Sequence, residues 1–139
     1  MAAEAEIEAG SLDKAREYIN RVRARAATPT TFVPGANANY VIGLYNTPFA
    51  DQATAREAVR FERKLELGME GHRFFDLVRW GVADAAINAF LSYEKTKLPS
   101  TYGTAAFAKG KNEFFPIPQV QIDLQTTGGT SNVTQNPGY

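Results

Sequence analysis

Apolar residues recur at helical spacing in several segments of the chain. Between Leu12 and Ala27 they return every three or four positions, on one face of a helix, while charged residues occupy the other positions. Ser11 precedes this segment and is a suitable N-cap, and Gly10 separates it from a first helix over residues 2–9. Two helices joined by a tight turn predict a helical hairpin of the tetratricopeptide type.

A second helical region extends from Thr54 to about Trp80. Thr54 and Glu57 have the spacing of a capping box, and Gly68 and Gly71 are the positions at which we expect this helix to bend. Apolar residues fall on every side of a helical wheel drawn through the region. A helix of that kind is expected to be enclosed by protein.

The rest of the chain has weaker periodicity, apart from one further helix over residues 82–95. Residues 28–53 form a long loop rich in Thr, Pro, Gly and Asn. Residues 98–139 are expected to be mostly extended or loop, because two prolines favour extended geometry at the residues before them. The predicted fold class is all-α, as a single helical domain over residues 1–139. It contains a hairpin, a long bent helix, a further helix and an extended, proline-flanked C-terminal segment.

Composition excludes several classes of function. Fifteen basic and fifteen acidic residues balance, so we expect no nucleic-acid partner. The chain has no cysteine, which excludes thiolate metal sites and thiol nucleophiles. Its one histidine, His72, cannot form a multi-histidine metal site, and we expect it to be buried and hydrogen-bonded.

Glutamates and arginines gather along the second helical region. On a continuous helix Glu62, Glu66 and Glu70 share one face with Arg73, and carboxylates at successive four-residue steps repel one another. Enclosing them is unfavourable unless guanidinium groups pair with them. We therefore predict a structural ion-pair network. Its members are Glu62, Arg63, Glu66, Glu70, Arg73, Asp76 and Arg79.

The expected partners of these acids on the preceding helix are Arg21, Arg23 and Arg25. If the partner of Glu66 is enclosed, the Glu66→Ala substitution should lower the free energy of unfolding by about 3–5 kcal/mol. If the pair is exposed to solvent, the loss should stay below about 1 kcal/mol.

Catalytic and metal-binding interpretations of the same charges are weaker. Acid–base catalysis needs two carboxylates in a cleft with separated pKa values, and the sequence indicates neither a cleft nor an electrophile. A di-iron site of the Glu-x-x-His type would need a glutamate three residues before His72, where Met69 stands. We therefore predict that the protein is not an enzyme and has no catalytic residue, metal or cofactor.

The long loop carries aromatic and amide side chains together. Aromatic rings cover the apolar faces of sugars while amides satisfy sugar hydroxyls, so this combination suits glycan binding. The alternative is that the aromatic residues hold the loop against the helices. The candidate glycan-binding residues are Tyr40, Tyr45, Asn39 and Asn46.

The segment ERKLELGMEGHRFFDLVRWG, residues 62–81, resembles the signature of the SusD/RagB family, the surface glycan-binding lipoproteins of Bacteroidetes. Three more segments resemble family motifs in the same order along the chain. They are AREYINRVRARA at residues 15–26, NEFFPIPQVQID at residues 112–123 and QNPGY at residues 135–139. The four segments together span most of the chain.

This resemblance implies a mostly helical protein with tetratricopeptide-like helix pairs, located at the surface of the outer membrane. Family members hand oligosaccharides to a SusC-like, TonB-dependent transporter, so an oligosaccharide and this transporter are the implied partners. The matched motifs are scaffold motifs, and the resemblance assigns no ligand-binding residue to a position here. It covers only the C-terminal part of a family member, and the chain carries no signal peptide or lipidated cysteine. We therefore expect a fragment, an excised domain or a truncated relative.

Two functions remain open at this point. The first is the C-terminal scaffold part of a cell-surface protein that captures oligosaccharides for the transporter. The alternative is a helical docking module that binds the transporter, or associates with itself, without binding sugar of its own.

Overall fold

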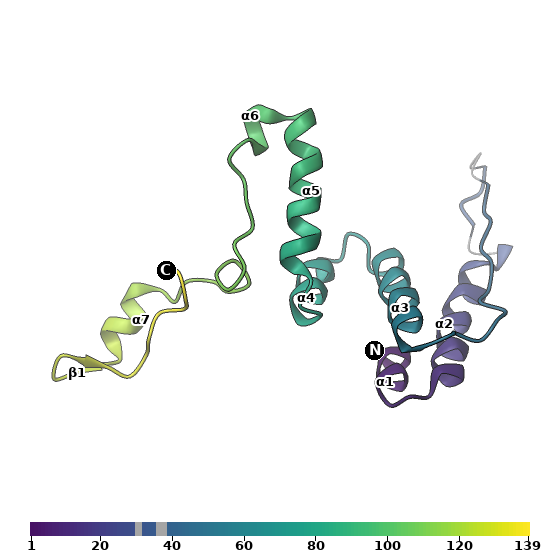
Figure 1. Ribbon diagram of the computed structural model, residues 1–139, viewed down its shortest axis with the longest axis horizontal. Coiled ribbons are helices and arrows are strands. Elements are labelled where there is room, and N and C mark those ends of the chain that lie inside the picture. Colours follow the sequence, from purple (N-terminus) through teal and green to yellow (C-terminus); the bar gives the residue numbers. More distant parts are fainter. Residues whose placement is uncertain (30–31, 36–38) are drawn as a thin grey trace. The chain divides into compact units, whose positions relative to one another are not determined.

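The structure, a computed structural model, describes residues 1–29, 32–35 and 39–139. Figure 1 shows the helices and strands, coloured in chain order. They form two compact units, Met1–Glu70 and Gly71–Tyr139. In the described part of the chain the only sheet is a two-stranded hairpin, and the other regular elements are helices. The all-α class is therefore confirmed. The assignment of residues 1–139 to one domain stays a prediction.

Three helices build the first unit. They are α1 (Ala2–Glu8), α2 (Leu12–Ala26) and α3 (Gln52–Glu66). The turn between α1 and α2 places Gly10 at φ 85°, a conformation that glycine adopts without strain. Ser11 occupies the N-cap position of α2, although its side chain makes no cap hydrogen bond. The predicted hairpin is thus present, and its tetratricopeptide-like geometry stays a prediction.

Small side chains dominate the core of this unit and let the helices approach closely. Helix α3 packs against both α1 and α2, and Tyr45 and Phe49 from the long connection cover the edge of the core. The buried apolar residues are Ala3, Ile7, Ala15, Ile19, Ala55, Ala58 and Val59.

The N-terminus of α3 differs from the predicted one. Asp51 is the N-cap, and its Oδ1 accepts a hydrogen bond of 2.7 Å from the backbone N–H of Thr54. This bond is the main reason that the pKa of Asp51 lies below its usual value. Thr54 therefore lies inside the first turn, and the predicted Thr54–Glu57 capping box is wrong.

The predicted long bent helix is also wrong. Helix α3 ends at Glu66, and α4 (His72–Arg79) begins after a turn in which Met69 has φ 70° and Gly71 has φ 77°. Two left-handed residues so close together end the helix instead of bending it. The helical wheel that placed Arg73 beside the glutamates of α3 therefore does not apply beyond Glu66.

Several apolar residues of this region are exposed, which contradicts the expectation of an enclosed helix. Phe61 is 51% exposed, Leu65 is 56% exposed and Phe75 is 61% exposed. The enclosed face of α3 instead carries Ala55 and Val59, together with the charged residue Glu62.

The second unit contains the remaining elements. Helices α4 and α5 (Ala83–Lys97) are followed by the short helices α6 (Pro99–Tyr102) and α7 (Gln119–Leu124). Strands β1 (Thr126–Thr127) and β2 (Thr130–Ser131) pair antiparallel, with Thr126 opposite Ser131. Helix α5 matches the helix predicted over residues 82–95, whereas α6 and α7 interrupt the segment predicted to be extended or loop. None of the helices in the described residues combines the length and the apolar character needed to cross a bilayer.

Candidate functional site

Two arginines of α2 pair with two glutamates of α3. Arg23 donates from Nη1 to Oε1 of Glu62, and Arg25 donates from Nη2 to Oε2 of Glu66. The first pair is enclosed, with side-chain exposures of 18% for Arg23 and 9% for Glu62. The second is open to solvent on its arginine side, because the Arg25 side chain is 68% exposed. Both carboxylates are thus neutralised by cations of the neighbouring helix.

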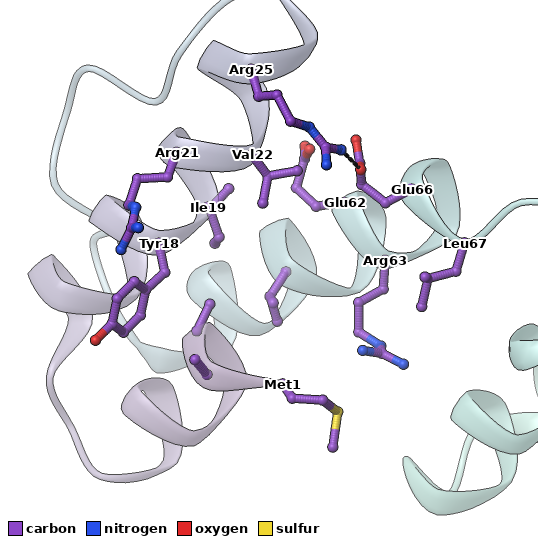
Figure 2. A pocket seen from close by; sticks show the side chains of 13 residues that line it. Met1, Tyr18, Ile19, Arg21, Val22, Arg25, Glu62, Arg63, Glu66 and Leu67 are labelled. Carbon is purple, nitrogen blue, oxygen red and sulfur yellow. Dashed lines mark hydrogen bonds and ion pairs between the residues drawn. The ribbon is translucent and has the colours of Figure 1, made fainter.

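These glutamates line a groove of about 520 Å³ among α1, α2 and α3. Figure 2 shows Arg25 of α2 reaching toward Glu66 of α3, with Glu62 beside them and Met1 on the far side of the groove. Ile19, Val22 and Val59 also line the groove and make it largely apolar.

The charges of this groove do not have the arrangement of an acid–base catalytic site. Its two carboxylates each accept a hydrogen bond from a guanidinium group, so neither stands as an unpaired acid or base. Among the described residues, no group of three or more His, Cys, Asp or Glu side chains is placed to hold a metal ion.

The other residues of the predicted network are distributed over both units. Arg63 lines the groove among α1, α2 and α3, and Glu70 lies in the turn after α3. In the second unit, Nε of Arg79 donates to Oδ1 of Asp76 at 2.9 Å, and the Asp76 side chain is only 6% exposed. The structural role of the full predicted set stays a prediction.

Trp80 lies beside two arginines in the second unit. The guanidinium carbon of Arg73 is 5.7 Å from the centre of the Trp80 ring, and that of Arg79 is 5.0 Å away.

His72 is exposed at the start of α4, so the expectation that it is buried is wrong. His72 is exposed because the chain breaks before α4, which puts this residue in the first turn of a short helix instead of the middle of a long one.

The long connection is held against α2 by polar contacts that sequence reasoning missed. The amide of Asn20 brackets the backbone of Tyr45: Nδ2 donates to the carbonyl oxygen at 3.0 Å, and Oδ1 accepts from the N–H at 2.9 Å. Arg16 donates to the same carbonyl at 3.3 Å, and Arg23 donates to the carbonyl of Gly43. Arg16, Asn20 and Arg23 recur at four- and three-residue spacing, so one polar face of α2 was the available signal.

The predicted glycan-binding residues fall into two kinds of environment. Tyr45 is half-buried: its ring lies 5.5 Å from that of Phe49, and the guanidinium carbon of Arg23 is 5.0 Å from its centre. Burial is the main cause that raises the pKa of the Tyr45 phenol, and the Glu62 carboxylate adds to it. Tyr45 therefore acts as an anchor of the connection.

Tyr40 is 39% exposed and stacks on Phe32, with ring centres 4.2 Å apart and planes 9° from parallel. One face of the Tyr40 ring is thus covered by another ring. Asn39 and Asn46 are exposed. Of the four candidates, Tyr45 lines a groove, together with Phe49 and Phe61. The glycan-binding role of all four residues stays a prediction.

Hydrogen bonds join the proline-flanked segment, residues 112–123, to the C-terminal segment, residues 135–139. The Gln135 amide brackets the backbone of Ile117, accepting from its N–H at 2.7 Å and donating to its carbonyl at 2.9 Å. Nδ2 of Asn136 donates to the carbonyl of Phe115 at 2.6 Å, and the hydroxyl of Tyr139 donates to that of Phe114 at 3.1 Å. The segment at residues 135–139 thus fixes the proline-flanked segment in its extended form.

Comparison with known proteins gives two findings. The model of the SusD family matches residues 1–139, the full length of the chain. Over 83 residues the chain is 45% identical to the SusD-like protein P25 of Formosa agariphila, a match that covers 59% of the chain and 13% of that protein. The chain therefore spans a small part of the length of this relative.

Proposed function

Because the chain belongs to the SusD family, we propose that it is the C-terminal scaffold part of a cell-surface glycan-binding protein. In this role the complete protein captures oligosaccharides at the outer membrane, where it is held as a lipoprotein, and passes them to a SusC-like, TonB-dependent transporter. The observation that carries the proposal is the family match over residues 1–139.

The contacts within the family-like segments support a scaffold role. Arg23 and Arg25 are used to neutralise glutamates of α3, and Gln135 is used to fix the backbone of Ile117. Polar groups engaged in this way hold the fold together. Because Glu62 and Glu66 are paired with arginines, neither is placed as a free acid or base, and we expect no hydrolysis of oligosaccharides by the chain.

Calorimetric titration of the chain with a panel of oligosaccharides tests the proposal. We expect heat of binding for at least one sugar of the panel, and no release of reducing ends on prolonged incubation. Heat from no sugar of the panel would contradict sugar binding by these residues.

A docking module is the second candidate function, and the exposed apolar side chains favour it. Phe61 and Leu65 lie four positions apart on α3 and are 51% and 56% exposed. A helix face of this kind is commonly an interaction surface. Capture of a purified SusC-like transporter by a chain that binds no sugar would favour docking over glycan binding.

A further inference from the structure

A second groove of the first unit joins aromatic side chains to an acidic one. It has a volume of about 480 Å³ and lies between the end of the long connection and α3. This volume is in the range of small-ligand sites. The residues that line it are Tyr45, Thr47, Pro48, Phe49, Ala50, Thr54, Glu57, Ala58 and Phe61.

The aromatic side of the groove is both exposed and firmly held. Phe61 projects from α3 with 51% of its surface accessible, so its ring is available to a ligand. Tyr45 and Phe49 form the adjoining wall, with their rings tilted by 58°. The part of the connection that carries them is fixed at Tyr45 by Asn20, and it ends at Asp51, the N-cap of α3. A wall preorganised in this way loses little conformational freedom when a ligand binds.

The polar side of the groove carries a negative charge. Glu57 is exposed, and among the described residues its carboxylate has no hydrogen-bond or ion-pair partner. The described residues that line the groove include no lysine or arginine. A carboxylate of this kind accepts hydrogen bonds from hydroxyl groups and repels carboxylate and sulfate groups.

We propose that this groove is a subsite for neutral oligosaccharides, built by the chain itself. The apolar C–H face of a pyranose ring stacks on Phe61, while its hydroxyls donate to the Glu57 carboxylate. Uncharged hexose chains fit this charge, and uronic or sulfated chains do not. The inference rests on the proposed glycan-binding function and adds a location and a class of sugar to it.

Calorimetric titration with cellohexaose, maltohexaose, laminarihexaose and hexagalacturonate tests this assignment. We expect the 139-residue chain to bind at least one of the three neutral sugars and to bind the hexagalacturonate more weakly. The Phe61→Ala variant should bind the neutral sugar about tenfold more weakly or worse. The Glu57→Gln variant should lose affinity for the neutral sugar and discriminate less against the acidic one.

Phe75→Ala is the matched control, because Phe75 is another exposed phenylalanine, on α4, that does not line the groove. Its affinity should equal that of the unchanged chain, and circular dichroism should show that all three variants are folded. Sugar binding that Phe61→Ala and Glu57→Gln leave unchanged would refute this subsite and keep the proposed function. Preference for the hexagalacturonate would refute the neutral class, and binding of none of the four sugars would overturn the subsite together with sugar binding by this chain.

Discussion

Arg23 and Glu62 form an enclosed ion pair between α2 and α3, although 39 positions separate them in the chain. Arg23 also donates to the carbonyl of Gly43 and covers one face of the Tyr45 ring. One guanidinium group therefore joins two helices and the connection between them.

Removal of the Glu62 carboxylate should destabilise the first unit strongly. The Glu62→Ala variant leaves the Arg23 guanidinium enclosed without its counter-charge, which should lower the free energy of unfolding by about 3–5 kcal/mol. Urea denaturation followed by circular dichroism measures the change. Glu66→Ala is the matched control, since its partner Arg25 is mostly exposed, and its loss should stay below about 1 kcal/mol. Equal losses in the two variants would contradict the difference in enclosure.

Replacement of Asn20 should release the long connection from α2. Asn20→Ala removes both hydrogen bonds to the Tyr45 backbone, which should lower the free energy of unfolding by about 1–3 kcal/mol. Amide hydrogen exchange of the Tyr45 N–H should become faster, because local opening is then easier. Asn46→Ala, which alters an exposed amide, should leave this exchange rate unchanged.

The phenol of Tyr45 should make the folded state sensitive to alkaline pH. Burial, aided by the Glu62 carboxylate, raises its pKa in the folded state above the usual value of 10.0. The stabilisation linked to the neutral phenol is therefore fully present below pH 10.0 and is lost as the pH rises through the folded-state pKa.

Unfolding measured over this alkaline range checks the expectation. The Tyr45→Phe variant has no phenol to ionise, so its stability should fall less steeply than that of the unchanged chain. Tyr93→Phe, which alters a tyrosine that is 61% exposed, should follow the unchanged chain. A parallel decline in all three proteins would contradict the assigned role of burial.

The C-terminal segment should separate from the proline-flanked segment when Gln135 is replaced. Gln135→Ala removes the two hydrogen bonds that bracket Ile117 and should cost about 1–3 kcal/mol of local stability. Proteolysis at low protease concentration should then cut residues 114–118 faster than in the unchanged chain. Gln119→Ala is a suitable control, because the Gln119 side chain donates to Oδ1 of Asp123 within the same helix at 2.8 Å and, among the described residues, makes no bond to residues 114–118.

The isolated chain should associate with itself. Phe115 and Leu124 are 73% and 74% exposed, and exposed apolar surface favours association in water. Light scattering over a range of concentrations should show an average mass that rises with concentration. A mass that stays at the monomer value of 15.2 kDa at high concentration would count against this expectation.

Helices α1, α2 and α5 were predictable, because periodicity is a local property. The apolar face predicted between Leu12 and Ala27 includes Ala15 and Ile19, and both are buried. Pairing of glutamates on α3 with arginines on α2 was also predictable, since enclosed carboxylates need cations. Which arginine pairs with which glutamate could not be predicted, because the pairing depends on how α2 packs against α3.

The break between α3 and α4 could not be predicted from the local sequence. Gly68 and Gly71 indicated a weak point, but a glycine can bend a helix or end it, and the left-handed backbone at Met69 had no signal in the sequence. The loop anchors were missed for a related reason. Asn20 gains its role only when a segment 25 residues away lies against it.

By itself, the sequence determined the class of fold, the positions of α1, α2 and α5 and the family resemblance of its motifs, because each depends on residues close together in the chain. The tertiary structure decided which charges are enclosed, which aromatic residues anchor the connection and which of them stay accessible beside Glu57. These properties depend on burial, and burial is set by neighbours distant in sequence.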